Sequence, residues 1–320
     1  MILHEELLGQ MMSDLGLNTP FVKGQSITIK NCWHFSTDGN HVDQLFYDGN
    51  DFIAGMNRVY ILAKKYSIII LAFSLMDTHV HFVLYGKLED CQGFMHEFVR
   101  LTSRHIATVH HDNNKMLGVP VNYQTVDSDR YLKTVICYTV KNAPTGGIPF
   151  MGWDYPWSSG PLYFRKPGMW SSPLWTTDGI KHNLDDRITV QRKMLNTRKR
   201  QDKSVIMMGP LVFPGEYVAY ETVEDVFKTC KSYNYFMSST RDDMVDSRDG
   251  IISHLCIPMQ EMRQHKNELC AAMFGVRTVK ALDTSKRIRL ARALHSRYNS
   301  SVKQIARLCG LLYDEVKNMV

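Results

Sequence analysis

The sequence lacks the patterns that mark disulfide-bonded, zinc-binding or membrane-spanning proteins. Its seven cysteines are scattered and odd in number, and no CxxC pair occurs. We therefore expect neither a disulfide framework nor a zinc knuckle, and a reducing, cytoplasmic location fits. The longest strongly apolar run, Ile68 to Met76, is far too short to cross a bilayer. No basic leader or cleavage signal is present at the start, which argues against secretion.

Internal repeats and low-complexity tracts are also missing, and the composition is that of a globular protein. A chain of 320 residues with 44% hydrophobic and 22% charged residues can bury a full core and hold more than one domain. The net charge of +6 is unevenly placed. Seven basic residues and one acid lie within 187–203, and eight basic residues and two acids within 286–320. Such clusters are typical of proteins that bind a polyanion, although a solvated helix face is the alternative.

A pair of histidines is the most informative feature that is present. The stretch LMDTHVHFVLY at 75–85 places His79 and His81 two residues apart. Alternate residues of a β-strand project from the same face, so both imidazoles would lie side by side. Val80 and Phe82 would point to the other face, where a core can bury them. Two imidazoles on a rigid strand can hold a divalent metal ion.

A helix predicted within 127–144 supplies the second half of the candidate site. Pro144 and the glycines after it are expected to end this helix. Tyr138 and Asn142 are four residues apart and therefore share one helical face. A tyrosine hydroxyl beside a side-chain oxygen ligand, directed at a two-histidine metal site, is the layout that a phosphotyrosine nuclease needs.

Hydrophobic periodicity predicts the element order β-α-β-β-α-β-α for the first half of the chain. This order suggests an α+β fold with a ferredoxin-like antiparallel sheet, helices on one face, and the histidines on the opposite, open face. The predicted strands are 26–35, 68–75, the histidine strand and 119–126, and the predicted helices are 51–66, 94–111 and the tyrosine helix.

We expect three parts: a domain at 1–165 that holds the histidines and Tyr138, an irregular wrap and basic linker at 166–205, and an all-α C-terminal region at 206–320. The spacing of Ala306, Gly310 and Val316 predicts a helix-turn-helix near 285–320. Ile305, Leu308 and Val316 would form its seam. A plain helical hairpin is the alternative.

Three motifs in this order resemble the HUH single-tyrosine transposases, in particular the REP-associated tyrosine transposases. The stretch LMDTHVHFVL at 75–84 is similar to the histidine motif of that family. The stretch YTVKNAP at 138–144 is similar to its tyrosine motif, and WDYPWSS at 153–159 to the segment that follows. The resemblance covers about residues 26–165, and the basic tail resembles the extra helix-turn-helix of longer members.

The resemblance implies an HUH nuclease core that cleaves single-stranded or hairpin DNA. His79, His81 and Asn142 would be ligands of Mg²⁺ or Mn²⁺, and Tyr138 would be the nucleophile. Its attack would give a 5′-phosphotyrosine and a free 3′-hydroxyl, and the covalent bond would allow strands to be rejoined. Related enzymes occur as monomers and homodimers.

Basic side chains are expected to follow the DNA backbone, with Tyr85 or Tyr123 available for stacking on bases. The candidates are Arg100, Arg104 and Lys133 beside the nuclease site, Arg198, Lys199 and Arg200 in the linker, and Lys303, Arg307 and Lys317 in the tail.

The sequence also departs from the family pattern. Asp77 and Thr78 precede the first histidine where the family has proline and asparagine, and a basic residue is lost from the tyrosine motif. The inferred catalytic side chains are all retained.

Other interpretations remain open. A domesticated transposase that is catalytically silent and only binds DNA would use the same basic segments. A hydrolase of the amidohydrolase type would need eight alternating β/α units, which are not seen, and a relaxase or replication initiator usually has another motif order. Tyr131 is an alternative nucleophile but is expected to pack in the core. His105 and His110 are expected to be solvated.

Overall fold

The computed structural model describes most of the chain in two compact units, Met1–Val245 and Asp246–Val320. Within the described ranges, only the backbone is described for a few residues, among them Asn142 and Lys303. The boundary between the two units lies after Val245, whereas the sequence predicted boundaries at residues 165 and 205. The described ranges are 4–18, 28–37, 45–111, 119–145, 151–165, 181–238, 259–276, 278–298 and 302–317.

A four-stranded antiparallel sheet forms the centre of the first unit, in the order β2-β3-β1-β4. The mixed α and β architecture expected from the sequence is confirmed. The helix α2 (Gly49–Lys65) connects β1 to β2, and α3 (Leu88–Val109) connects β3 to β4. The strands are β1 (Cys32–Thr37), β2 (Ile68–Leu75), β3 (Val80–Gly86) and β4 (Val121–Thr125).

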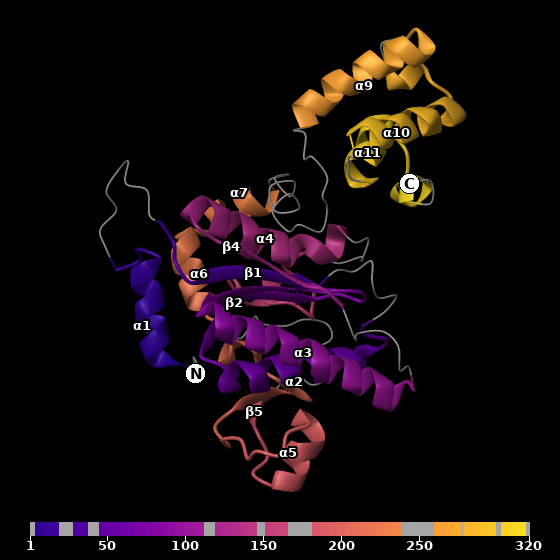
Figure 1. Ribbon diagram of the computed structural model, residues 1–320. Helices are drawn as coiled ribbons and strands as arrows, with labels where there is room; N and C mark the ends of the chain where they lie inside the picture. Colours follow the sequence, from indigo (N-terminus) through magenta and orange to yellow (C-terminus); the bar gives the residue numbers. More distant parts are fainter. Residues whose placement is uncertain are drawn as a thin grey trace. The chain divides into compact units, whose positions relative to one another are not determined.

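Helices cover both faces of this sheet (Figure 1). On one face Phe82 packs edge-on against Phe94 and Phe98 of α3, with ring centroids 5.2 and 5.4 Å away. On the other face lies α4 (Asp129–Thr145), which contacts β2 and β3. The expectation of helices on one face only is therefore wrong, and the histidine face is not open. The reason is that α4 has an apolar side of its own, including Leu132 and Val135, which it buries against the sheet.

The helix α4 ends at Thr145, between Pro144 and the glycines that were expected to end it. The chain after α4 is described from residue 151, and the short helix η1 (Gly160–Leu162) directly follows the WDYPWSS segment. Ser159 Oγ accepts a hydrogen bond from the Phe73 N–H, 3.0 Å away, which ties this segment to β2.

The start of α2 is held to the end of α3 by one buried carboxylate. Asp51, which is 1% exposed, lies 2.8 Å from Nε2 of His105 and 2.8 Å from Nε2 of His110. It also accepts a hydrogen bond from the Tyr47 N–H. The expectation that these histidines are solvated is therefore wrong. Burial alone raises the pKa of Asp51, but these three hydrogen bonds outweigh burial and hold the pKa below its usual value.

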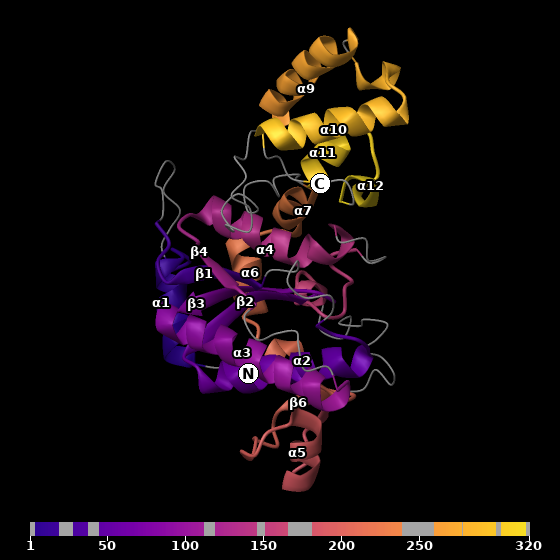
Figure 2. The ribbon, with the colours of Figure 1, turned by 45° about the vertical axis from the view of Figure 1, so that its right-hand side comes forward.

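The described part of the predicted basic linker, 181–205, is folded. It contains β5 (Lys181–Asn183) and α5 (Ile188–Leu195), and β5 forms a three-stranded antiparallel sheet with β6 (Ile206–Met208) and β7 (Leu211–Val212), which follow the linker. This segment, residues 181–213, lies against α2 (Figure 2). We call it the β5–β7 segment.

Asn57 of α2, which is 1% exposed, joins this segment to the central domain. Its Nδ2 donates to the Met194 and Pro210 carbonyls, and its Oδ1 accepts from the Val212 N–H at 2.8 Å. The amide thus uses three of its four hydrogen-bonding positions, and these three bonds hold both α5 and β7.

Further helices complete the first unit: α1 (Glu5–Asp14), η2 (Pro214–Glu216), α6 (Tyr220–Phe227) and α7 (Cys230–Ser238).

Tyr85 is 1% exposed, and its hydroxyl donates to Asp14 of α1, so the expectation that it stacks on bases is wrong. Tyr123 is 44% exposed at the β4 edge, but it pairs with Phe35 on the sheet face away from the histidines. Among the described helices, none has the length and apolar character to cross a membrane.

The described elements of the second unit are all helical: α9 (Met259–Phe274), η3 (Val279–Ala281), α10 (Thr284–Tyr298), α11 (Val302–Cys309) and α12 (Tyr313–Lys317). The predicted all-α region thus begins later than residue 206, since β6 and β7 follow that position. Gly310 between α11 and α12 has φ 62°, and Ile305, Leu308 and Val316 are buried as expected. Glu315 accepts a hydrogen bond from the Leu312 N–H at 2.9 Å, which caps α12.

We expect Asn57→Ala to lower the free energy of unfolding by about 3 kcal/mol, because the buried Val212 N–H and two partly buried carbonyls lose their partner. Hydrogen exchange should become faster in the β5–β7 segment but not in the central sheet. Urea denaturation and hydrogen exchange measure both effects. The matched control is Asn50→Ala, which removes an exposed side chain from the same helix. Equal stability of the two variants would contradict the anchoring role of Asn57.

Candidate active site

Tyr138 of α4 lies over the histidine face of the sheet. Its ring is edge-on to His81, with centroids 5.5 Å apart, and edge-on to His34, 5.9 Å away. The side chain is half-buried. Tyr131, by contrast, is 2% exposed and its hydroxyl lies 3.4 Å from Gln124 Oε1, so it packs in the core as expected. The structure therefore brings Tyr138, and not Tyr131, to the histidines.

His34 of β1 is part of this cluster, and the sequence analysis missed it. Its Nε2 lies 3.1 Å from Nδ1 of His81, and the two rings stack with centroids 5.3 Å apart. His34 is 0% and His81 is 2% exposed. The expectation of an open histidine face is wrong for His81 because α4 covers it.

The register of β1 explains why His34 reaches His81. Ser36 lies opposite His81 and His34 lies opposite Val83, so the two imidazoles are diagonal neighbours on one face of the antiparallel pair. From the sequence alone, the alternation of residues along β1 would predict that His34 shares a face of the strand with Cys32 and Ser36. The pairing of β1 with β3 depends on the whole fold and could not be taken from the local sequence.

His79 precedes the first residue of β3 and lies beside His81, with ring centroids 5.1 Å apart at 85°. Its Nδ1 is 2.9 Å from the Thr78 hydroxyl, and its carbonyl accepts a hydrogen bond from the Met76 N–H. Both contacts fix the ring at the edge of the cluster. His79 is half-buried and more accessible than His81.

Two polar side chains are buried beside the histidines. Ser36 Oγ and Gln124 Nε2 are buried and make no hydrogen bond within the described part of the chain. Ser36 lies opposite His81, and Gln124 lies opposite His34 on β4. Buried polar atoms normally have partners, so a cluster of this kind is expected where a site takes up water, an ion or a ligand.

The third predicted ligand, Asn142, is in α4 one turn after Tyr138, but its side chain lies outside the described residues. No group of three His, Cys, Asp or Glu side chains suited to a metal ion is found among the residues that are described. A metal site here would therefore combine His79 and His81 with an oxygen ligand of another type. The amide predicted for Asn142 is such a ligand.

The bond between His34 and His81 fits a ligand role for His81. A histidine that binds a metal through one ring nitrogen commonly makes a hydrogen bond through the other, which fixes its tautomer and orientation. Nδ1 of His81 makes this bond to His34.

The predicted DNA-binding residues are scattered over the two units. Arg100 and Arg104 lie on α3, on the sheet face away from Tyr138, so their expected position beside the histidines is wrong. Lys133 is on α4 and forms an ion pair with Asp129 at 2.6 Å. A role in DNA binding stays a prediction for all of them. The remaining candidates are exposed after α5 (Arg198, Lys199 and Arg200) or in the second unit (Arg307 and Lys317), and the side chain of Lys303 lies outside the described residues.

No protein-family model, curated protein or solved structure matches this chain. The functional assignment therefore rests on the site itself. A tyrosine hydroxyl next to clustered imidazoles has the elements of a nucleophile beside metal-binding or proton-carrying groups.

We expect His34→Leu to lower the free energy of unfolding by about 2 kcal/mol, because buried Nδ1 of His81 loses a partner. The ring nitrogen chemical shifts of His81 should change with it, and His34→Gln should restore part of the stability. Urea denaturation and nitrogen NMR measure these effects. Ser36→Ala is the matched control: it alters the same strand face but removes no hydrogen bond, so its effect should stay below about 0.5 kcal/mol. Unchanged His81 signals in His34→Leu would contradict this role.

Proposed function

We propose that the chain is a metal-dependent endonuclease and transposase of the HUH single-tyrosine class that acts on single-stranded DNA at hairpin-associated sites. The observation that carries the proposal is the position of the Tyr138 ring, edge-on to His81 and His34. The three sequence motifs that resemble this class support the same proposal independently of this position.

The topology supports a ferredoxin-like core. The order β1-α2-β2-β3-α3-β4 with the sheet order β2-β3-β1-β4 is that of a split β-α-β unit. In this interpretation α4 is an addition to the core that carries Tyr138 across the free sheet face.

His79, His81 and Asn142 would hold Mg²⁺ or Mn²⁺, since imidazole and amide oxygen together suit these ions. When bound, the ion would polarise the scissile phosphate and stabilise the charge that develops on it. The role of His34 is to orient His81. His79, as the more accessible of the two histidines, would meet the DNA first.

Tyr138 supplies the nucleophile. A free tyrosine has a pKa of about 10, so near pH 7 the ionised form is scarce and its proton must leave during attack. The Tyr138 oxygen forms a bond to phosphorus, and the bond from phosphorus to the 3′-oxygen breaks. The 3′-oxygen takes up a proton, so one proton is lost and one is gained. The resulting 5′-phosphotyrosine keeps the bond energy, and attack by a 3′-hydroxyl would rejoin strands.

A catalytically silent DNA-binding protein derived from a transposase is the second candidate. One observation favours it: His81 is 2% exposed, so any approach to the centre is restricted to the His79 side. The basic residues of α11 and α12 would serve either function, and the protein would act as a monomer or homodimer.

We expect Tyr138→Phe to abolish formation of a covalent protein–DNA adduct while leaving DNA binding within about twofold, because only the nucleophilic oxygen is removed. The assay uses end-labelled hairpin DNA with a single-stranded flank, Mn²⁺ or Mg²⁺, and a denaturing gel. Tyr131→Phe is the matched control, since it removes a buried hydroxyl from the same helix.

An adduct in the wild type and in Tyr131→Phe, but not in Tyr138→Phe, is the expected result. An adduct that persists in Tyr138→Phe would rule out this nucleophile. Binding without an adduct, with several hairpins and both metal ions, would favour the silent DNA-binding protein.

The α11–α12 pair is expected to contact DNA phosphates through Arg307 and Lys317. The double variant Arg307→Gln/Lys317→Gln should reduce the slope of log affinity against log salt concentration by about 1.4 to 1.8, because two phosphate contacts are lost. Fluorescence anisotropy at several salt concentrations measures the slope.

The matched control is Arg263→Gln/Lys280→Gln, which removes the same charge from exposed positions elsewhere in the second unit. Equal slopes for the two double variants would refute a specific role for α11 and α12. The full chain is used because Met262 and Leu269 of α9 share a core with Ile305 and Val316, so a truncation at residue 285 would break that core.

A further inference from the structure

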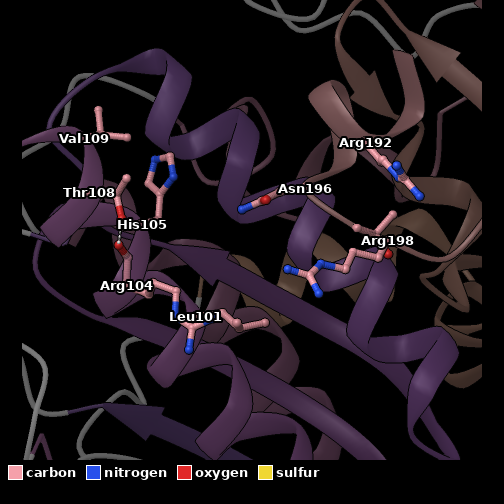
Figure 3. A pocket seen from close by; sticks show the side chains of 9 residues that line it. Leu101, Arg104, His105, Thr108, Val109, Arg192, Asn196 and Arg198 are labelled. Carbon is pink, nitrogen blue, oxygen red and sulfur yellow. Dashed lines mark hydrogen bonds between the residues drawn. The ribbon is translucent and has the colours of Figure 1, made fainter. Parts of the chain in front are cut away.

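We propose that a cavity between α3 and the β5–β7 segment binds a nucleoside phosphate through Arg104, Arg192 and Arg198. The cavity has a volume of about 710 Å³, which is within the range of small-molecule sites. Arg104 and His105 come from α3 on one side, and Arg192 and Arg198 come from α5 and the loop after it on the other (Figure 3).

The first support is the charge of the lining. The cavity is lined by three arginines, and no Asp or Glu is among its lining residues. None of the three arginines forms an ion pair within the described part of the chain. Their neighbours behave differently: Arg100 pairs with Glu97, and Arg200 pairs with Asp186 at 2.6 Å. Unpaired guanidinium groups along one cavity repel one another, and a bound anion relieves this repulsion. Of the three, Arg198 extends toward the α3 side, whereas Arg192 points away from it (Figure 3).

The second support is that both walls are fixed. Asn57 holds α5 through the Met194 carbonyl and β7 through Pro210 and Val212. Asp51 holds the other wall, because its carboxylate fixes His105 and His110 near the end of α3. A site whose walls are fixed before binding loses less entropy when the ligand binds.

The Asp51 carboxylate lies behind the lining of the cavity. It is 1% exposed, it is not part of the lining, and it is shared by two imidazoles. Its pKa is lowered by the hydrogen bonds described above, so it stays ionised at neutral pH and keeps the His105 ring in place.

The size and the remaining lining indicate more than a bare phosphate. Leu101 and Val109 add apolar surface, and Thr108, Asn196 and Thr197 add neutral hydrogen-bonding groups. Guanidinium groups bind phosphate oxygens in a bidentate manner, and the apolar and neutral groups suit a sugar and base. A nucleoside phosphate has this combination, either as a free nucleotide or as one unit of a nucleic acid strand.

The cavity is separate from the tyrosine centre. Its lining residues Leu101 to Val109 belong to α3, which lies on the face of the sheet opposite to α4 (Figure 1). The proposal therefore does not depend on the proposed nuclease activity, and Tyr138→Phe should bind the same ligand as the wild type.

The test is isothermal titration of the full chain at low salt with inorganic pyrophosphate, a deoxynucleoside monophosphate and a short single-stranded oligonucleotide. Arg104→Gln and Arg198→Gln should each weaken binding by about tenfold or more, because a charge-assisted hydrogen bond to phosphate is lost. Arg192→Gln is a further variant of the same lining. The matched control is Arg100→Gln, which lies on α3 one turn before Arg104, outside the lining; it should change affinity by less than about twofold.

The three ligands distinguish the sources of the phosphate. Binding of the mononucleotide that is lost in Arg104→Gln and Arg198→Gln indicates a free nucleotide as ligand. Loss confined to the oligonucleotide indicates a strand. The proposal is overturned if the wild type binds none of the three ligands, or if both variants bind them as the Arg100→Gln control does. Since all these side chains are exposed, unchanged urea denaturation curves are expected for every variant.

Discussion

The antiparallel pairing of β1 with β3 is the constraint on which the candidate site depends. It sets Ser36 opposite His81 and thereby brings Nε2 of His34 to 3.1 Å from Nδ1 of His81. The same pairing gives the sheet two unlike faces. Phe82 and its neighbours form an apolar face that α3 buries, and the histidines form a polar face that α4 covers. A shift of β1 by one residue would exchange these faces and bury His34 among phenylalanines. The register thus fixes the core and the cluster together.

Each face of the sheet then has its own chemistry, set by the helix that covers it. On the polar face, α4 brings Tyr138 to the imidazoles. On the apolar face, α3 has its inner side in the core and its outer side toward the β5–β7 segment, where Arg104 joins Arg192 and Arg198. Asn57 is what makes the second arrangement possible, because one buried amide attaches an appended segment to α2 at three points. A surface that would otherwise be a solvated helix side becomes the wall of a cavity.

Local patterns in the sequence were enough to find β2, whose bounds agree with the prediction, and the helix that carries Tyr138. They also placed His79 and His81 together and predicted the buried seam of α11 and α12. They failed where the answer depends on distant residues. The role of His34 requires the strand register, the covered histidine face requires the position of α4, and the folded β5–β7 segment requires Asn57, which lies more than a hundred residues away in sequence. Charge clustering identified residues 187–203 as basic, but it could not tell Arg198, which faces the cavity, from Arg200, which is paired with Asp186.

The hydrogen bond between His34 and His81 has a further consequence for a metal site. Two neutral imidazoles that share an N–H···N bond hold one proton between them, so the bond has a direction. If His81 donates through Nδ1, its Nε2 carries a lone pair and can bind a metal ion. If His34 donates instead, Nε2 of a neutral His81 carries the hydrogen and cannot bind one. A metal ion on His81 would therefore select one tautomer of His34 as well. The ring of Tyr138 lies edge-on to both histidines, so the choice of tautomer also sets which imidazole nitrogens carry hydrogen near the proposed nucleophile. His34 would then belong to the functional unit although it need not contact the DNA.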